Sequence, residues 1–317
     1  MTITVAPPVE ELTASLRDNK KHLLLAASGS VATIKLPNII QALSSHSNLS
    51  IRVLLTPSAS RFLAGQSAEQ PTPASLSTLP NVDGVYGDTD EWREPWTRGN
   101  AILHIELRRW ADILVIAPLS ANTLAKVVNG MADSILTSVV RAWDARGELD
   151  SDALALRGGN GGEVAGAEVP GEAEASSSSA AGSSSQMLTA GRSQVEGGTG
   201  SGNGGRSRRK KKRIVVAPSM NTAMWRHPIT AKQIRVLENE WGVGRDKDGR
   251  DADADGGASQ PRHCGGGNED DGDEGDGWFE VLRPQSKLLA CGDRGDGAMC
   301  EWTEIVRVIE DRLSLNG

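Results

Sequence analysis

The sequence predicts an α/β domain in which one open, mostly parallel β-sheet carries helices on both of its faces. Short apolar runs, each followed by a turn of small polar residues and then by a helical pattern, recur about five times. The small polar residues fall where the predicted strands end. Because open parallel sheets bind ligands at this edge, the same pattern predicts a ligand site there.

Two long segments of the 317-residue chain have compositions that do not support a folded core. Residues 146–212 are rich in Gly, Ser, Ala and Glu, and residues 245–277 are rich in Asp, Gly, Asn and Glu. We predict that both inserts and a tail over residues 1–19 are disordered, because they contain too little apolar surface to offset the entropy cost of ordering. The prediction is therefore one domain over residues 20–317, interrupted by two inserts.

Charge and cysteine content narrow the classes of protein that are compatible with the sequence. The net charge of −7 comes partly from the acidic insert, and no general basic surface indicates nucleic-acid binding. We favour the interpretation that the basic run 208–213 is a solvated end of the first insert. The alternatives are a nuclear localisation signal or a patch that binds an acidic partner. Three cysteines without a secretory signal or membrane-spanning run predict a cytoplasmic protein, with the nucleus as the alternative. No metal site is predicted, because the pair His263-Cys264 has no second pair of ligands at a suitable spacing.

The first predicted unit is a strand over residues 22–27, the turn Ser28-Gly29-Ser30 and a helical pattern that continues to Leu43. Pro37 lies inside this pattern, so we expect a kink or an irregular start to the helix. A turn of small residues allows a phosphate to approach backbone N–H groups at the start of a helix. The turn lacks the three spaced glycines of dinucleotide sites, so NAD is not predicted.

The second predicted unit is a strand over residues 51–55, which ends at Thr56-Pro57-Ser58 before a helix over 59–63. Either hydroxyl can cap the helix, which is the simpler interpretation, or it can face a phosphate or the polar edge of a ring.

We expect residues 66–100 to be irregular. The acids and tryptophans between Asp88 and Trp96 predict either a docking surface for another subunit or a packed loop.

A helix is predicted over residues 102–110, with His104 near its start. A single histidine on a helix is usually structural, although imidazole can also transfer protons near neutral pH. Residues 112–117 predict a central strand, because every residue after Asp112 in this run is apolar. Small polar residues again follow this strand, at Ser120, Asn122 and Thr123, and a helix is predicted over 131–143.

The run 214–217 predicts a further buried strand, which ends at Pro218. The segment that follows holds one amide and two methionines, Asn221, Met220 and Met224. This combination suits a pocket that binds a flat apolar ring and one polar group, but a core strand with an asparagine turn is equally compatible. The remaining predicted elements are a helix over 228–241, a short strand over 278–282, a glycine-rich loop over 289–299 and a helix over 301–315.

Seven segments, taken together, have a more specific pattern than any one of them. They are residues 26–32, 104–112, 117–126, 141–144, 218–225, 290–293 and 297–299. Their combination resembles the phosphopantothenoylcysteine decarboxylase family, homo-oligomeric FMN-containing cysteine decarboxylases that include the halotolerance proteins. The resemblance implies a single Rossmann-like (flavodoxin-like) sheet and FMN as the cofactor. The two inserts depart from the family's pattern.

The resemblance also implies roles for individual residues. Asn221 would hold the substrate carboxylate, Met224 would close over it, and His104 would act in proton transfer or orientation. Cys291 would protonate the enethiol left after loss of CO2, which a neutral thiol can do because its ordinary pKa lies above 7. Ala290 and Met299 would contact the substrate. The residues implied in FMN binding are Gly29, Ser30, Val31, Thr56, Ser58, Ser120, Ala121, Asn122 and Thr123, with Met220 near the ring.

The function implied is FMN-dependent decarboxylation of 4′-phosphopantothenoylcysteine to 4′-phosphopantetheine, in coenzyme A biosynthesis. The implied assembly is a homotrimer, or a heterotrimer with paralogues, in which the histidine and cysteine of one site come from different chains. One alternative is a halotolerance-type regulatory subunit that binds and inhibits a protein phosphatase, which the acidic segment 266–276 keeps open. Decarboxylation of a peptide's C-terminal cysteine is a third, less favoured interpretation.

Overall fold

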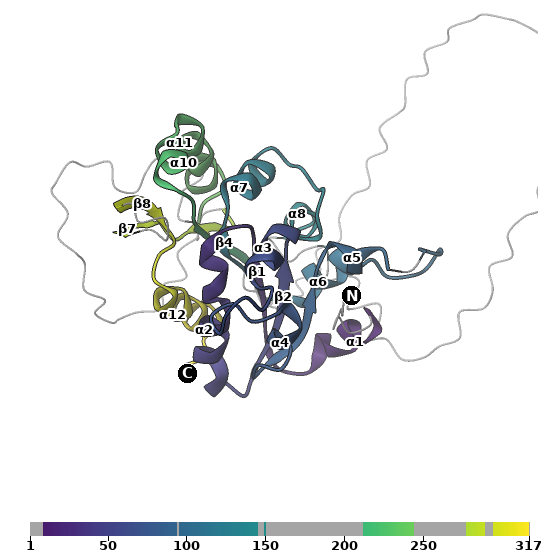
Figure 1. Cartoon of the computed structure of the whole chain (residues 1–317). Coiled ribbons are helices and arrows are strands. Elements are labelled where there is room, and N and C mark those ends of the chain that lie inside the picture. The colour runs from purple at the N-terminus through teal and green to yellow at the C-terminus, as the bar shows by residue number, and fades with distance from the viewer. Residues whose placement is uncertain are drawn as a thin grey trace, which may run out of the picture. The chain divides into compact units, whose positions relative to one another are not determined.

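Six parallel strands form the centre of the molecule in the order β3-β2-β1-β4-β5-β6 (Figure 1). The computed structural model describes residues 9–93, 95–144, 149, 212–243, 277–288 and 294–316, which belong to one compact unit. The strands are β1 Lys21–Ala27, β2 Leu49–Leu55, β3 Val82–Tyr86, β4 Ile113–Leu119, β5 Arg213–Pro218 and β6 Phe279–Val281. This is the Rossmann strand order, in which the connections reverse direction between β1 and β4.

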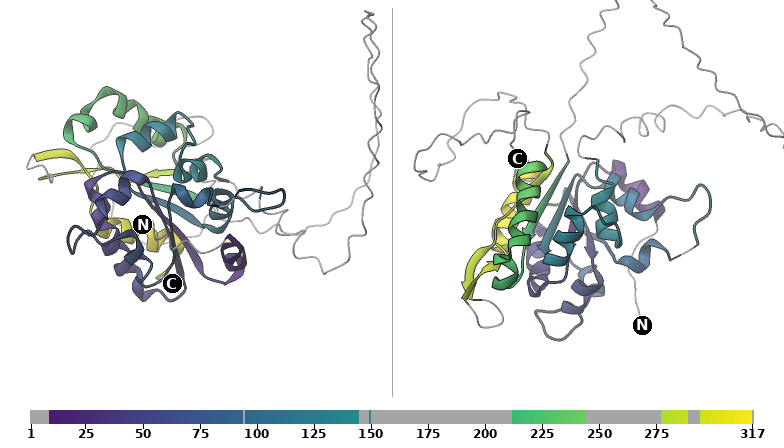
Figure 2. Two further views of the ribbon diagram at one scale, coloured as in Figure 1. Left: turned by 45° about the vertical axis from the view of Figure 1, so that its right-hand side comes forward. Right: turned by 90° about the horizontal axis from the view of Figure 1, so that it is seen from above.

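Helices cover both faces of the sheet, as the sequence predicts (Figure 2). The 3-10 turns are η1 Ser15–Arg17, η2 Val31–Lys35 and η3 Leu43–Ser45, and η4 Val236–Glu240 is a π-helical turn. The α-helices are α1 Val9–Ala14, α2 Leu36–Ala42, α3 Pro57–Phe62, α4 Pro73–Leu76, α5 Asp88–Glu91, α6 Leu103–Trp110, α7 Ala121–Val128, α8 Ile135–Arg141, α10 Thr222–Arg226, α11 Pro228–Arg235 and α12 Trp302–Leu313.

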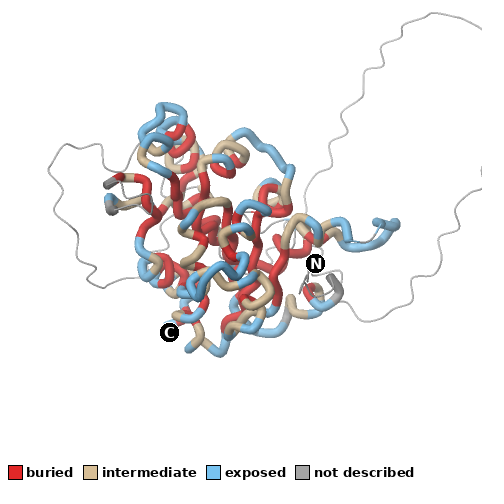
Figure 3. The backbone as a smooth tube through the Cα atoms, in the orientation of Figure 1, coloured by how far each residue is buried: buried red, intermediate tan, exposed pale blue. Residues whose placement is uncertain are grey.

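Alternate residues of β1 enter two separate cores. Leu23 and Leu25 pack on the face covered by α2 and α12, whereas Leu24 and Ala26 pack on the face covered by α6, α7 and α8. All four side chains are fully buried, and the tube in Figure 3 is red along the central strands. Because both faces are covered, the strands have to be continuously apolar, which is why the sequence indicates them clearly.

The structure corrects the prediction for residues 66–100. This segment contains α4, α5 and the edge strand β3 instead of an irregular loop. β3 escaped the sequence pattern because Asp83 and Gly84 interrupt its three apolar residues.

The predicted disordered tail over residues 1–19 is also wrong in part, because residues 9–17 form α1 and η1 and Leu12 is fully buried. The two predicted inserts lie almost entirely outside the described residues, so their boundaries stay predictions.

Two further segments differ from a simple strand–helix alternation. The helix after β1 has an irregular start, as Pro37 predicts: the 3-10 turn η2 comes first, and α2 begins at Leu36. The predicted glycine-rich loop contributes β8 Arg294–Ala298, which pairs antiparallel with β7 Gln285–Leu288.

No helix within the described residues is long and apolar enough to cross a membrane.

The hydroxyl of Ser28 joins the ends of β1 and β4. It donates to the carbonyl oxygen of Pro118 at 3.0 Å and accepts the backbone N–H of Ser120 at 2.7 Å. Ser28 is fully buried, so no water can replace these bonds without a rearrangement. This side chain therefore fixes the two strand ends relative to each other.

We predict that Ser28→Ala lowers the free energy of unfolding by about 1–3 kcal/mol, because it leaves the buried N–H of Ser120 without an acceptor. Urea denaturation measures this change. Ser75→Ala is the control: the Ser75 hydroxyl bonds at the surface to the Thr72 carbonyl, and its loss should cost less than about 0.5 kcal/mol. Equal effects of the two substitutions would contradict the prediction.

Candidate ligand and active site

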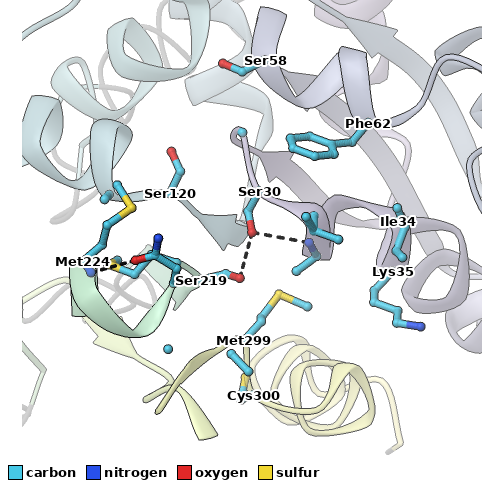
Figure 4. A pocket seen from close by; sticks show the side chains of 18 of the residues that line it. Ser30, Ile34, Lys35, Ser58, Phe62, Ser120, Ser219, Met224, Met299 and Cys300 are labelled. Atoms are coloured by element: carbon cyan, nitrogen blue, oxygen red, sulfur yellow. Dashed lines mark hydrogen bonds between the residues drawn. The ribbon is translucent and has the colours of Figure 1, made fainter. Parts of the chain in front are cut away.

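A cavity of about 520 Å³ opens at the carboxyl end of the sheet, at the point where the strand order reverses (Figure 4). Its walls come from the turns after β1, β2, β4 and β5 and from the segment that joins β8 to α12. In a doubly wound sheet the connections leave β1 and β4 toward opposite faces, which opens a crevice between their ends. The topology alone therefore accounts for the position of the cavity.

The turn after β1 lies against the turns after β2 and β5. A Cβ on Gly29 would come within 2.5 Å of the Cβ of Ser58, so only glycine allows this approach. The hydroxyl of Ser30 bonds to the hydroxyl of Ser219 at 2.8 Å and accepts the N–H of Ala32 at 3.4 Å. These contacts, of which two are dashed in Figure 4, hold three strand ends around the cavity.

The turn after β4 contributes Ser120, Ala121 and Asn122 to the cavity wall. The Ser120 hydroxyl caps α7 by accepting the N–H of Thr123 at 3.4 Å. Thr123 itself is buried behind this turn and is not among the residues that line the cavity. Thr56 is placed in the same way: it is buried and caps α3 by accepting the N–H of Ala59. Thr56 and Thr123 therefore support the cavity wall instead of facing the cavity.

The turn after β5 places Met220, Asn221 and Met224 at the cavity. The side-chain oxygen of Asn221 accepts the N–H of Met224 at 2.8 Å and so caps α10. This bond determines which way the amide points, because its oxygen accepts the N–H of Met224. Within the described part of the chain, its NH2 group has no hydrogen-bond partner and can donate. Met224 is 47% exposed, so a large part of its side chain remains available at the cavity.

β8 closes the cavity against the turn after β5. The backbone N–H of Met220 donates to the carbonyl oxygen of Gly297 at 2.9 Å. A Cβ on Gly297 would come within 2.2 Å of the Met220 carbonyl oxygen, so glycine is required here as well. Arg226 of α10 adds an ion pair to Asp296 of β8, and the hydrogen bond from Arg226 lowers the pKa of that carboxyl.

Several lining residues were not predicted from the sequence. Phe62 lies one helical turn after Ser58 on α3, and Ile34 and Lys35 end the turn η2. The spacing of Ser58 and Phe62 is the available signal, since residues four apart share one helix face.

Cys300 also lines the cavity, although no motif in the sequence marks it as a site residue. Burial raises the pKa of its thiol to about 12, and Glu304 and Glu301 add to the shift. The thiol is therefore protonated at neutral pH.

His104 lies on α6 and is not among the residues that line the cavity. Its Nδ1 lies 2.7 Å from one carboxylate oxygen of Glu91, and its backbone N–H donates to the other at 3.2 Å. Ala290 and Cys291 lie outside the described residues. Of the predicted catalytic residues in the described part of the chain, Asn221 and Met224 line the cavity. Met299, which was predicted to contact the substrate, lines it as well.

Comparison with known proteins shows which family this chain is similar to. A family model described as "Flavoprotein" matches residues 11–149 and 206–245, which make up more than half of the chain. The chain belongs to the flavoprotein family.

Among its relatives, this flavoprotein is 28% identical to mouse phosphopantothenoylcysteine decarboxylase over 300 residues, which cover 95% of this chain and 91% of that one. It is 29% identical over 313 residues to a fission yeast (Schizosaccharomyces pombe) protein named probable thymidylate synthase, covering 98% of this chain but only 32% of that one. The chain therefore spans about a third of the fission yeast relative and most of the mouse relative.

Two solved structures share the fold of this flavoprotein. A mutant of PPC decarboxylase complexed with pantothenoylaminoethenethiol aligns with a TM-score of 0.53 at 29% identity, covering 94% of this chain and 100% of that one. HAL3 from Cryptococcus neoformans aligns with a TM-score of 0.51 at 25% identity, and the alignment covers 94% of this chain and 99% of that one. These findings confirm the predicted fold class and the resemblance to cysteine decarboxylases and halotolerance proteins.

We predict that Cys300 resists alkylation in the folded protein, because its buried thiol has a pKa of about 12 and only the thiolate reacts. Treatment with iodoacetamide at pH 8, followed by peptide mass spectrometry, measures this. The control is the same protein unfolded in about 8 M urea. Under these conditions Cys300 should be modified. Rapid labelling of Cys300 in the folded protein would contradict the prediction.

Proposed function

We propose that this flavoprotein catalyses the FMN-dependent decarboxylation of 4′-phosphopantothenoylcysteine to 4′-phosphopantetheine, a step of coenzyme A biosynthesis. The observation that carries the proposal is the position of Asn221 at the cavity, where its side-chain oxygen is bonded to Met224 and its NH2 group has no hydrogen-bond partner among the described residues. A carboxylate accepts such donors, and the substrate's carboxylate is the group that leaves as CO2. The names of the mouse, Arabidopsis and rice relatives, all phosphopantothenoylcysteine decarboxylases, support the same reaction.

The cavity fits FMN in three respects. Its volume lies within the roughly 300–1,000 Å³ of small-molecule sites. The close approach of Gly29 and Ser58 forms a narrow turn region with exposed hydroxyls that suits the phosphate and ribityl groups. The residues that would hold FMN are Gly29, Ser30, Val31, Ser58, Ser120, Ala121 and Asn122, with Met220 as an apolar surface for the ring and with Thr56 and Thr123 behind them.

When bound, FMN would accept two electrons from the Cα–Cβ–sulfur unit of the substrate and return them after the loss of CO2, so that the reaction has no net oxidation. The chain's own residues would control position and protons. Asn221 would donate to the carboxylate, and Met224 and Met299 would cover the substrate and exclude water. Cys291, outside the described residues, would supply the proton for the last step.

We further propose that a second copy of the chain completes the site. His104 does not line the cavity of its own chain, yet the resemblance gives it a role in catalysis. Both statements are compatible if His104 faces the cavity of a neighbouring subunit in a trimer. The substrate would then be enclosed by residues of two chains.

A phosphatase partner and a cytoplasmic location stay predictions. The names of the HAL3 relatives keep the phosphatase-binding alternative open. The acidic segment 266–276, from which that alternative was inferred, lies outside the described residues.

We predict that the purified protein with FMN converts 4′-phosphopantothenoylcysteine to 4′-phosphopantetheine, detected by mass spectrometry as a loss of CO2. Asn221→Asp should lower kcat/KM by about 100-fold or more, because aspartate still caps α10 but repels a carboxylate and cannot donate to it. Asn129→Asp is the control, since Asn129 bonds to the Ala125 carbonyl at the surface. A protein that neither binds FMN nor releases CO2 would contradict the proposed function.

We predict that a mixture of His104→Asn and Cys291→Ser proteins regains activity, although each protein alone is inactive. Random exchange of subunits should place an intact histidine and an intact cysteine together in roughly a quarter of the sites. The measurement is product formation after mild dissociation and reassembly, with each variant treated alone as the control. Absence of rescue after confirmed subunit exchange would argue against a shared site.

A further inference from the structure

The carboxylate of Glu91 binds His104 through both of its oxygens. One oxygen lies 2.7 Å from Nδ1 of the imidazole, and the other accepts the backbone N–H of His104 at 3.2 Å. The Glu91 side chain is only 6% exposed, whereas that of His104 is 22% exposed. The contact is therefore largely shielded from solvent on the Glu91 side and accessible on the side of the imidazole.

The two contacts determine the tautomer of His104. A carboxylate can only accept hydrogen bonds, so Nδ1 must carry the proton that it shares with Glu91. In the neutral ring, Nε2 then has a free lone pair. Within the described part of the chain, Nε2 makes no hydrogen bond, so it is available to a group outside this chain.

We propose that Glu91 is a positioning residue for His104, which holds the imidazole with Nε2 unprotonated and directed away from its own chain. The inference rests on the proposed function, because it assigns His104 a proton-transferring Nε2 in the decarboxylase. Glu91 is not among the residues that line the cavity of its own chain, and in this proposal it acts through His104.

Glu91 is suited to this role because it also anchors the start of α6. His104 is in the first turn of α6, where backbone N–H groups have no partners within the helix, and Ile102 provides no side-chain cap. The second oxygen of Glu91 supplies the missing acceptor at a helix end that favours negative charge. Backbone and ring are thus held by one carboxylate, which fixes the direction of the ring.

The other charged groups near this contact are bound elsewhere. On α5, Asp88 accepts the N–H of Ile135, and Asp90 binds Arg93 and the N–H of Gly87. On α6 itself, Glu106 binds Arg109, and Arg108 faces Asp144 at 3.8 Å. Among the described residues, Glu91 is the acidic group bound to the ring of His104.

An amide in place of the carboxylate would reverse the tautomer. Glutamine has one acceptor oxygen, whereas Glu91 serves two donors. The backbone N–H of His104 cannot change, so the oxygen of glutamine would accept it and the NH2 group would face Nδ1. Nδ1 would then have to accept, and the proton would move to Nε2.

The test is solid-state ¹⁵N NMR of protein labelled at its histidines, with His104→Gln used to assign the signal. In the wild type with a neutral ring, we expect a protonated Nδ1 and an unprotonated Nε2 at His104. Glu91→Gln should exchange the two signals and lower kcat by about 100-fold, with a much smaller change in KM. Glu91→Asp, which keeps the carboxylate, should retain the wild-type tautomer and part of the activity.

Asp90→Asn is the matched control, because it changes the neighbouring carboxylate of α5 to an amide without touching His104. It should leave the tautomer and kcat unchanged. A wild-type His104 with its proton on Nε2, or a Glu91→Gln protein with the wild-type tautomer, would overturn the proposal. The wild-type measurement needs no change at Glu91, and the NMR signals do not depend on turnover. A protein that does not decarboxylate the substrate would therefore contradict the proposed function without affecting this measurement.

Discussion

The structure depends on the close approach of four strand ends at the carboxyl edge of the sheet. The Ser28 hydroxyl ties β1 to β4, and the bond between Ser30 and Ser219 ties β1 to β5. Gly29 allows the turn after β2 to enter the same space, because any Cβ there would overlap Ser58. These contacts are buried or partly buried, so each polar group needs its partner. The cavity is the space that these turns leave between them.

The same turns that form the cavity also cap helices. Thr56, Ser120 and Asn221 each accept a backbone N–H at the start of the helix that follows their strand. A capping side chain has one orientation, so the remaining donor or acceptor of the group also has a fixed direction. For Asn221 this leaves the NH2 group without a hydrogen-bond partner among the described residues, at the cavity wall. Thr56, in contrast, is buried and is not among the residues that line the cavity.

The sequence was sufficient to predict the sheet because its central strands are buried on both faces and hence continuously apolar. It failed at β3, an edge strand that carries Asp83 and Gly84. It also failed at α1, whose single fully buried leucine, Leu12, gives too weak a signal to distinguish a short helix from a tail. Many of the cavity residues were named from the sequence, either by their positions after strands or through the family resemblance. Phe62 and Cys300 were not, because nothing local marks a side chain that reaches the cavity from a helix or from a distant segment.

The sequence by itself determined the fold class, the edge of the sheet that binds a ligand and the family resemblance, because these follow from the periodicity of apolar residues and from short motifs. Only the tertiary structure decided which hydroxyls face the cavity and which lie behind it, and that His104 lies outside the cavity of its own chain. It also brought Glu91 to His104 across a segment that the sequence predicts to be irregular. The physical reason is that such contacts join residues from separate elements, and their distances are set by packing instead of by spacing along the chain.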